Sequence, residues 1–331
     1  MLILYFLFAF LTCFEKIFVK GKKIIKFIKY INTMVQVIKL TPRGFCQGVM
    51  NAINVLQQAI IDYPTKHIYC VGWIVHNWSV VNTFIKQGVI FLDDTKQSRM
   101  QLIQELNDDN AVVVFSAHGT DDKVIALAKQ KGFIVIDATC KYVRKIHDLI
   151  HANINHYHII YIGKKNHPES IATLAINPNI IFIDVDEYKD PSKLVNLKLD
   201  ENQQYYLLNQ TTIALYDYLN IQQYLQAHYH NIVFDNEICD ATTNRQKAVL
   251  NMPSDVDLLI VVGDKASNNS NQLCYLGKTK NVESHLVLKA SELDSKWFIN
   301  KKKVAITAGT SSPKDDIKDI VDAINKIVKE I

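Results

Sequence analysis

The sequence lacks the glycine-rich loops that bind nucleotide phosphates, because it contains neither a Walker A loop nor a GxGxxG fingerprint. It also lacks a basic arm, since the lysines are spread along the chain and the formal net charge is only +4. No motif therefore indicates a nucleotide, and nucleic-acid binding has little support. The mild positive charge suits an anionic small molecule equally well.

Cysteine is sparse, with six residues in a chain of 331. A chain of this length with so few cysteines is not a small secreted disulfide scaffold, so a reducing compartment is expected. We predict the cytoplasm of a bacterial-type cell. A hydrophobic content of 48% indicates a globular protein, and the length alone favours about two or three domains.

The N-terminal segment lacks a hydrophobic run long enough to span a membrane. Residues 2–14 form an apolar run of 13 residues, whereas a transmembrane helix needs about 20. Residues 1–33 have three open interpretations: a targeting leader, a weak anchor, or an over-long gene start, because Met34 directly precedes the first convincing strand. We exclude them from the fold and expect the mature part not to be membrane-embedded. If they are a leader, the alternative location is a plastid-type organelle (apicoplast) after removal of about residues 1–33.

From Met34 onward the chain alternates apolar strand patterns with helical ones. Residues 35–40 and 111–115 read as strands, and Val49, Ile53 and Leu56 recur at helical spacing between them. Strands that alternate with helices over this length predict an α/β fold with mostly parallel sheets. In such sheets ligands bind beyond the carboxyl ends of the strands.

Three cysteines divide the chain into thirds. Cys46, Cys140 and Cys239 are 94 and 99 residues apart, and each follows an apolar run that reads as a strand. Thiolates delivered from three strand ends are suited to one metal centre, and cysteine selects zinc, copper(I) or iron–sulfur clusters. A lone cysteine is more often an inert buried hydrophobe, the interpretation we give to Cys13, Cys70 and Cys274.

Polar side chains gather in the other loops that follow strands. Hydroxyl, amide and imidazole groups beside free helix N-termini suit a phosphate or diphosphate. Each residue also has a simpler explanation, as an N-cap, a satisfied histidine or a first-turn glutamate. The candidates are His76, His118, His167, Glu169, Thr211, Thr212, Ser267, Asn269 and Ser311.

Eight segments of the chain resemble the IspH (LytB) family of 4-hydroxy-3-methylbut-2-enyl diphosphate reductases. The resemblance covers about residues 35–315, preserves the order of the motifs, and is most specific in CDATTNRQKAV. The segments read PRGFCQGV, IVHN, FSAHG, DATC, HPE, NQTT, DATTNRQ and TSSP.

The resemblance implies a three-lobed, trefoil-like arrangement of three small α/β domains around a central iron–sulfur cluster. It implies one 4Fe-4S cluster held by Cys46, Cys140 and Cys239, so that one iron keeps a free coordination position. Domain boundaries near the cysteines give residues 34–139, 140–236 and 237–331 as the three units.

The resemblance also implies the reaction, a reductive dehydroxylation to isopentenyl and dimethylallyl diphosphate that ends the non-mevalonate (MEP/DOXP) route to isoprenoids. Glu169 would supply the proton, Thr211 would bond the substrate hydroxyl or Glu169, and His118 and His167 would help to relay protons. Asn268 stands where the family's loop usually has serine, and its amide can still donate. The implied diphosphate-binding residues are His76, His118, His167, Thr211, Ser267, Asn268, Asn269 and Ser311.

The implied partner is an electron donor of the ferredoxin or flavodoxin type, and the mild basic balance would suit an acidic protein. Two alternatives without redox activity stay open. One is a zinc-stabilised regulatory protein with a closed coordination sphere, and the other is a diphosphate-binding module whose cysteines are core residues.

Overall fold

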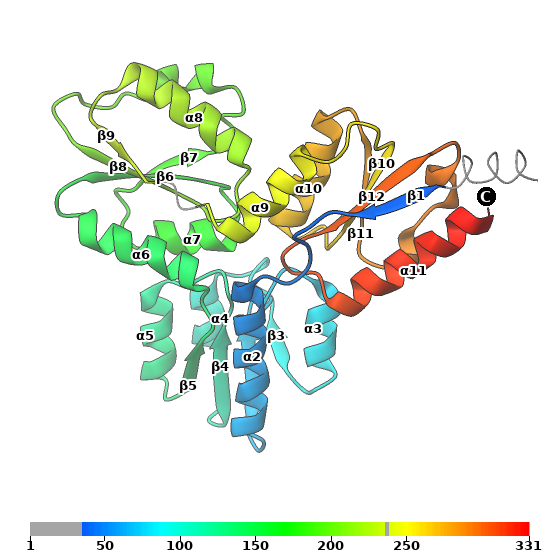
Figure 1. Cartoon of the computed structure of the whole chain (residues 1–331). Coiled ribbons are helices and arrows are strands. Elements are labelled where there is room, and N and C mark those ends of the chain that lie inside the picture. Colours follow the sequence, from blue (N-terminus) through cyan, green and yellow to red (C-terminus); the bar gives the residue numbers. More distant parts are fainter. Residues whose placement is uncertain (1–34, 236–237, 331) are drawn as a thin grey trace, which may run out of the picture.

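The computed structural model describes residues 35–235 and 238–330. The interpretations of residues 1–33, and Cys13 with them, lie outside the described residues. The described chain forms three lobes, each built on a four-stranded sheet (Figure 1). Every strand pairing within these sheets is parallel. The predicted three-lobed α/β fold is therefore confirmed.

Lobe 1 is built on the sheet with strand order β3-β2-β4-β5. Its strands are β2 (His67–Val71), β3 (Ile90–Leu92), β4 (Ala111–Phe115) and β5 (Ile134–Asp137). Its helices are α2 (Gln47–Asp62), α3 (Trp78–Ile85), α4 (Arg99–Glu105) and α5 (Asp122–Gln130). All five residues of β4 are buried, as expected for a central parallel strand covered on both faces.

Lobe 2 repeats this strand order as β7-β6-β8-β9. Its strands are β6 (His158–Gly163), β7 (Ile181–Asp184), β8 (Tyr205–Asn209) and β9 (Ile232–Phe234). Its helices are α6 (Lys141–Asn153), α7 (Pro168–Leu174), α8 (Leu215–His228) and the 3-10 helix η1 (Pro191–Asn196).

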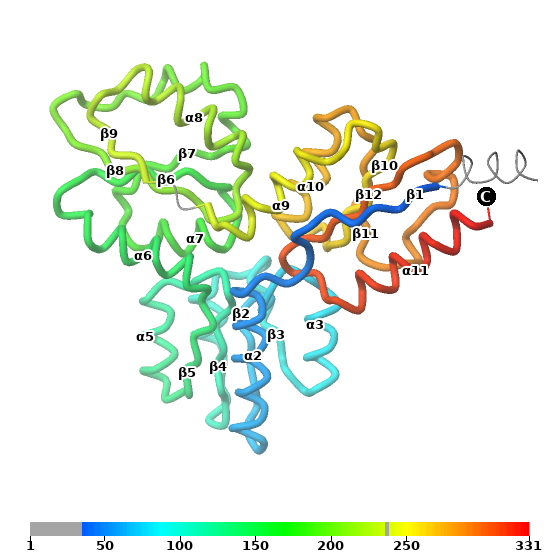
Figure 2. The backbone as a smooth tube through the Cα atoms, viewed as in Figure 1, coloured from blue at the N-terminus to red at the C-terminus, as the bar shows by residue number. Residues whose placement is uncertain are grey.

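Lobe 3 combines the two ends of the described chain in the order β1-β12-β10-β11. Its strands are β1 (Gln36–Lys39), β10 (Leu258–Val262), β11 (Glu283–Val287) and β12 (Lys303–Ala308). Its helices are α9 (Asp240–Leu250), α10 (Asn268–Thr279) and α11 (Lys314–Glu330), with the 3-10 helices η2 (Ala290–Glu292) and η3 (Ser295–Phe298). Figure 2 shows the blue β1 running beside the orange β12.

The first strand belongs to a different lobe from the one predicted from the sequence. β1 was expected in the unit 34–139 but pairs with β12, with Val37 opposite Val304. Parallel strands pair across any sequence separation, because the crossover need not be local. The division at about residues 139 and 236 stays a prediction.

The three cysteines stand where the chain passes from one lobe to the next. Each follows an edge strand, β1, β5 or β9, and precedes a helix that packs on another sheet. After Cys46, α2 buries Leu56 in the core of lobe 1. After Cys140, α6 buries Ile150 in lobe 2, and after Cys239, α9 buries Val249 in lobe 3. The lobes are thus linked through helices that begin at cysteines.

Two remaining expectations concern cysteine burial and membranes. Cys70 and Cys274 lie in hydrophobic cores, at 0% and 8% exposure, as predicted for inert cysteines. Within residues 35–235 and 238–330, no helix is long and apolar enough to cross a membrane.

The packing of α2 on lobe 1 gives a stability prediction. Leu56→Ala removes a fully buried side chain and should lower the free energy of unfolding by about 2–5 kcal/mol. Ile61→Ala on the same helix is the control, because Ile61 is 60% exposed and should change it by less than about 0.5 kcal/mol. Urea denaturation measures both, and equal losses would contradict the packing of α2.

Candidate active site

The three cysteines are held in the same way in their three places. Each occupies the N-cap position of a helix, Cys46 on α2, Cys140 on α6 and Cys239 on α9. Each backbone N–H donates to a carbonyl in the loop after the neighbouring strand. The acceptors are the carbonyls of Thr310 at 3.0 Å, Ala117 at 2.9 Å and Thr211 at 3.1 Å, for Cys46, Cys140 and Cys239 respectively.

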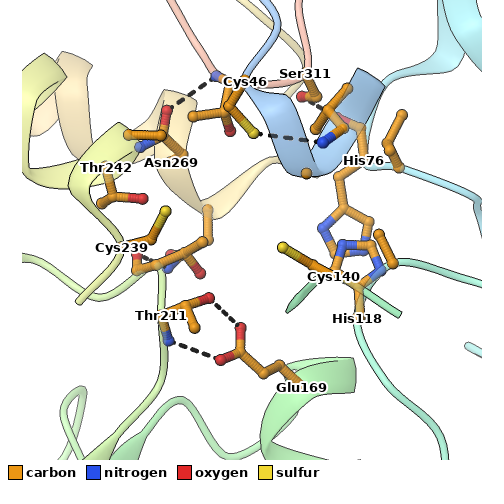
Figure 3. A pocket seen from close by; sticks show the side chains of 18 of the residues that line it. Cys46, His76, His118, Cys140, Glu169, Thr211, Cys239, Thr242, Asn269 and Ser311 are labelled. Atoms are coloured by element: carbon orange, nitrogen blue, oxygen red, sulfur yellow. Dashed lines mark hydrogen bonds between the residues drawn. The ribbon is translucent and has the colours of Figure 1, made fainter. Parts of the chain in front are cut away.

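The three thiols point into one pocket where the lobes meet (Figure 3). They are free thiols of intermediate exposure. Across the described residues, no three Cys, His, Asp or Glu side chains gather closely enough to bind a single metal ion. The sulfurs therefore surround a space rather than a point.

Gly48 keeps this space open between two of the thiols. A Cβ at this position would lie 2.5 Å from Sγ of Cys140 and 3.9 Å from Sγ of Cys46. The first distance is far below van der Waals contact, so a side chain here would displace the thiol. Burial raises the pKa of the Cys140 thiol, and it raises that of Cys239 to about 11.

Glu169 and Thr211 form a buried, hydrogen-bonded pair on the lobe 2 side of the pocket. The carboxylate accepts from the Thr211 backbone N–H at 2.7 Å and from its hydroxyl at 2.8 Å (Figure 3). Glu169 is 1% exposed. Burial raises its pKa to about 7, while the two bonds from Thr211 oppose the rise. The carboxyl group can therefore hold or release a proton near neutral pH.

Three histidines form a cluster on another side of the pocket. His76 and His118 stack with ring centroids 4.0 Å apart, and His167 meets both edge-on at 5.5 and 5.7 Å. Burial lowers the pKa of His76 to about 4 and that of His167 to about 3, and it lowers that of His118 as well. The cluster is therefore neutral at pH 7. Nδ1 of His167 accepts from the Glu169 N–H at 3.2 Å, which leaves Nε2 as its donor.

Lobe 3 contributes amides and hydroxyls to the pocket. Oδ1 of Asn269 accepts from the Thr310 N–H at 3.1 Å, and its buried Nδ2 has no partner among the described residues. Ser267 caps α10 and accepts from the Ser270 N–H at 3.3 Å. Ser311 donates to the carbonyl of His76 at 3.0 Å.

Asn268 crosses from lobe 3 to lobe 2. Its Nδ2 donates to the Thr212 carbonyl at 2.7 Å. Asn268 also lines the pocket. Every site residue predicted from the sequence does so, namely Cys46, His76, His118, Cys140, His167, Glu169, Thr211, Thr212, Cys239, Ser267, Asn268, Asn269 and Ser311.

Comparison with known proteins identifies the family. Residues 37–325 match the profile of the family described as LytB protein. The chain belongs to the LytB family. A Malacoplasma penetrans protein named 4-hydroxy-3-methylbut-2-enyl diphosphate reductase is 44% identical, with 84% of this chain and 93% of that protein covered. A Geobacillus protein of the same name is 38% identical, with 88% and 90% covered.

Solved structures agree with the family assignment. The E-1-hydroxy-2-methyl-but-2-enyl-4-diphosphate reductase of Plasmodium falciparum superposes with a TM-score of 0.78 at 31% identity, covering 87% of each chain. A second structure is described as (E)-4-hydroxy-3-methyl-but-2-enyl diphosphate reductase, the terminal enzyme of the non-mevalonate pathway. It gives a TM-score of 0.60 at 29% identity, covering 88% of this chain and all of that one.

Sequence reasoning about this LytB chain missed Arg99, which lies at the start of a helix rather than after a strand. Its guanidinium pairs with Asp94 at 2.8 Å and donates to the Gly119 carbonyl at 2.7 Å and the Ser116 hydroxyl at 3.0 Å. It therefore fixes the loop that carries His118. No pattern in the sequence pointed to this role.

Arg245 was also missed, although it lies inside the quoted DATTNRQ segment of the LytB resemblance. It is 4% exposed and donates to the carbonyls of Ala241 at 2.7 Å and Gly44 at 2.5 Å. Burial lowers its pKa, and charge on Cys46 or Cys239 would raise it. The guanidinium therefore lies close enough to balance negative charge at these sulfurs.

The Glu169–Thr211 pair gives a titration prediction. Thr211→Val should raise the pKa of Glu169 above about 7, because it removes a hydroxyl that donates to the charged form. Thr212→Val is the matched control, since its hydroxyl accepts from Gln210 rather than contacting Glu169. Infrared titration of the carboxyl band measures both, and an unchanged midpoint in Thr211→Val would contradict the assignment.

Proposed function

We propose that this chain reduces 4-hydroxy-3-methylbut-2-enyl diphosphate to isopentenyl and dimethylallyl diphosphate, the terminal step of the non-mevalonate pathway. Its family and the names of its relatives support this reaction. The observation that carries the proposal is a single pocket that combines three thiols, a buried acid and three neutral histidines. The reaction needs electrons, protons and a binding site for a diphosphate, which a cluster on the thiols, the acid and the histidines would supply.

The three thiols fit the iron–sulfur cluster expected of the family. We propose one 4Fe-4S cluster on Cys46, Cys140 and Cys239. Spaced sulfurs around a space that Gly48 keeps open suit a cluster, in which each thiolate binds a separate iron, better than a single zinc ion. When bound, such a cluster supplies electrons and one iron open to the substrate's hydroxyl.

Donors without charge would bind the diphosphate. The neutral rings of His76, His118 and His167 present N–H groups, and Asn269 has a buried N–H pair without a partner among the described residues. The N-terminus of α10, with Ser267, Asn268 and Asn269 in its first turn, adds backbone donors and a partial positive charge. The same side of the pocket includes Ser311.

Glu169 would protonate the leaving hydroxyl. Its carboxyl group can be protonated at neutral pH in the buried site, and Thr211 fixes both of its oxygens. Thr211 also reaches the pocket, where it can bond the substrate hydroxyl. We propose that His118 and His167 help to relay replacement protons, because they lie beside the pocket in neutral form.

The proposed electron donor is a ferredoxin or flavodoxin, and the proposed location is the cytoplasm, with a plastid-type organelle as the alternative.

Metal analysis separates the proposed cluster from the zinc alternative. After anaerobic purification, a protein that holds the cluster should be brown and contain iron and sulfide, whereas a regulatory zinc protein would contain zinc alone. Anaerobic turnover with a chemical reductant and the diphosphate substrate tests the reaction itself.

Replacing one proposed ligand should remove the cluster and leave the fold. Cys140→Ser should give a folded protein with little iron and no turnover, because the pocket loses one of three thiolates. Cys274→Ser is the matched control, because Cys274 lies in the core of lobe 3 and should leave the iron content unchanged. Iron analysis and circular dichroism measure both variants. A full cluster in Cys140→Ser would remove Cys140 from the ligand set.

Replacing the proposed acid should spare the cluster and slow the chemistry. Glu169→Gln should lower turnover by about 100-fold or more, the low end of what general acid catalysis contributes. In the unmodified protein, kcat/KM should fall as pH rises through about 7, because the carboxyl loses its proton there. This fall in kcat/KM above about pH 7 should be absent in Glu169→Gln and present in the control Glu187→Gln, whose side chain is exposed. Near-normal turnover in Glu169→Gln would exclude Glu169 from proton transfer.

A further inference from the structure

A second hollow lies on lobe 3, outside the central pocket. It runs between the loop that joins β1 to α2 and the first two turns of α11, which Figure 1 shows side by side. Its lining includes four cationic side chains and a single acidic one. The cations are Lys39, Arg43, Lys314 and Lys318, and the acid is Asp322. We call this hollow the cationic groove.

The cations of the groove are available to an external partner. Lys39, Lys314 and Lys318 are exposed, and none of the four cations forms an ion pair with a carboxylate in the described part of the chain. Lys314 and Lys318 lie one helical turn apart, so their charges reinforce each other on one face of α11. Arg43 is held by the Leu40 carbonyl at 2.9 Å.

The groove also has an apolar centre, as protein–protein interfaces do. Pro42, Phe45, Ile317 and Val321 line it together with Met50, which is 39% exposed. An apolar centre that includes an aromatic residue and methionine, inside a polar rim, is typical of protein–protein interfaces. The groove therefore fits a protein partner better than a free anion.

Consecutive residues of the chain line the groove and the central pocket. Gly44 and Phe45 line the groove, and the next residue, Cys46, lines the pocket. Gly44 is packed against α11, since a Cβ there would lie 3.0 Å from Cδ1 of Ile317. On the pocket side, the Arg245 guanidinium donates to the Gly44 carbonyl at 2.5 Å and holds the same glycine in place. The floor of the groove is therefore continuous, along the backbone, with a proposed cluster ligand.

The chain next to the other two cysteines has a different charge balance. Beside Cys140, the Arg144 charge is paired with Asp137 at 2.5 Å. Cys239 is followed directly by Asp240. Four cationic side chains, by contrast, line the groove beside Cys46.

We propose that the cationic groove is the docking site of a small acidic electron carrier of the ferredoxin kind. This inference rests on the proposed function, because it takes Cys46 as a ligand of the cluster. Opposite charge would steer the carrier to the face lined by Phe45, the residue directly before Cys46. Each carrier gives up one electron, so two dockings supply the two electrons. With two protons, these replace the substrate's C–O bond by C–H and release water.

Binding of oxidised ferredoxin tests the groove without any turnover. The double variant Lys314→Glu with Lys318→Glu should weaken binding by about 10-fold or more at low salt, in line with the effect of steering charges. The matched control is Lys326→Glu with Lys329→Glu, which changes the same charge on the same helix outside the groove. Isothermal titration of the full-length holoprotein measures both. Equal affinities in the two variants would overturn the proposal.

Turnover with two reductants separates this inference from the proposed function. With dithionite and methyl viologen, the groove variant should match the unmodified protein. With reduced ferredoxin its kcat/KM for the carrier should fall by about 10-fold or more, and the fall should shrink at high salt. Equal loss with both reductants would overturn the docking site. If the unmodified protein fails with the chemical reductant, the proposed function itself fails.

Discussion

The convergence of three cysteine-capped helices on one space is the constraint on which the structure depends. Cys46, Cys140 and Cys239 each sit at the point where the chain leaves one sheet and enters a helix of the next lobe. Each is fixed there by a backbone hydrogen bond to a strand-end loop. A shift of any lobe would therefore move a thiol, so the site is as rigid as the packing of the three cores.

Desolvation in this shared space favours the neutral form of both the histidines and the carboxylic acid. Burial makes ionisation costly for acids and bases alike. It keeps the three histidines neutral and raises the pKa of Glu169 to about 7. The result is a pocket whose donors carry little charge of their own. Arg245 is the positive group next to the sulfurs, and the helix N-termini add partial positive charge.

Much of this site could be predicted from the sequence because the site residues follow strands. The end of a strand can be predicted where an apolar run stops at polar residues. Cys46, His118 and Thr211 were found in this way, and so was the α/β class. The strand that pairs with β1 could not be predicted, because the pairing with β12 depends on the tertiary fold rather than on a local sequence pattern. Arg99 was missed for a related reason. Its role comes from contacts with Asp94, Ser116 and Gly119, which the fold alone brings together.

Asn268 shows how a departure from a family pattern can be read once the fold is known. The side chain of Asn268 is longer than that of the serine usual at this place in the family's loop. In the structure that length is used, because the amide spans from α10 to the Thr212 carbonyl of lobe 2. Thr212 follows Thr211, whose hydroxyl and N–H fix Glu169. The amide thus ties the helix proposed to bind the diphosphate to the loop that orients Glu169. Ser311, which donates to the His76 carbonyl, joins lobe 3 to lobe 1 in the same manner.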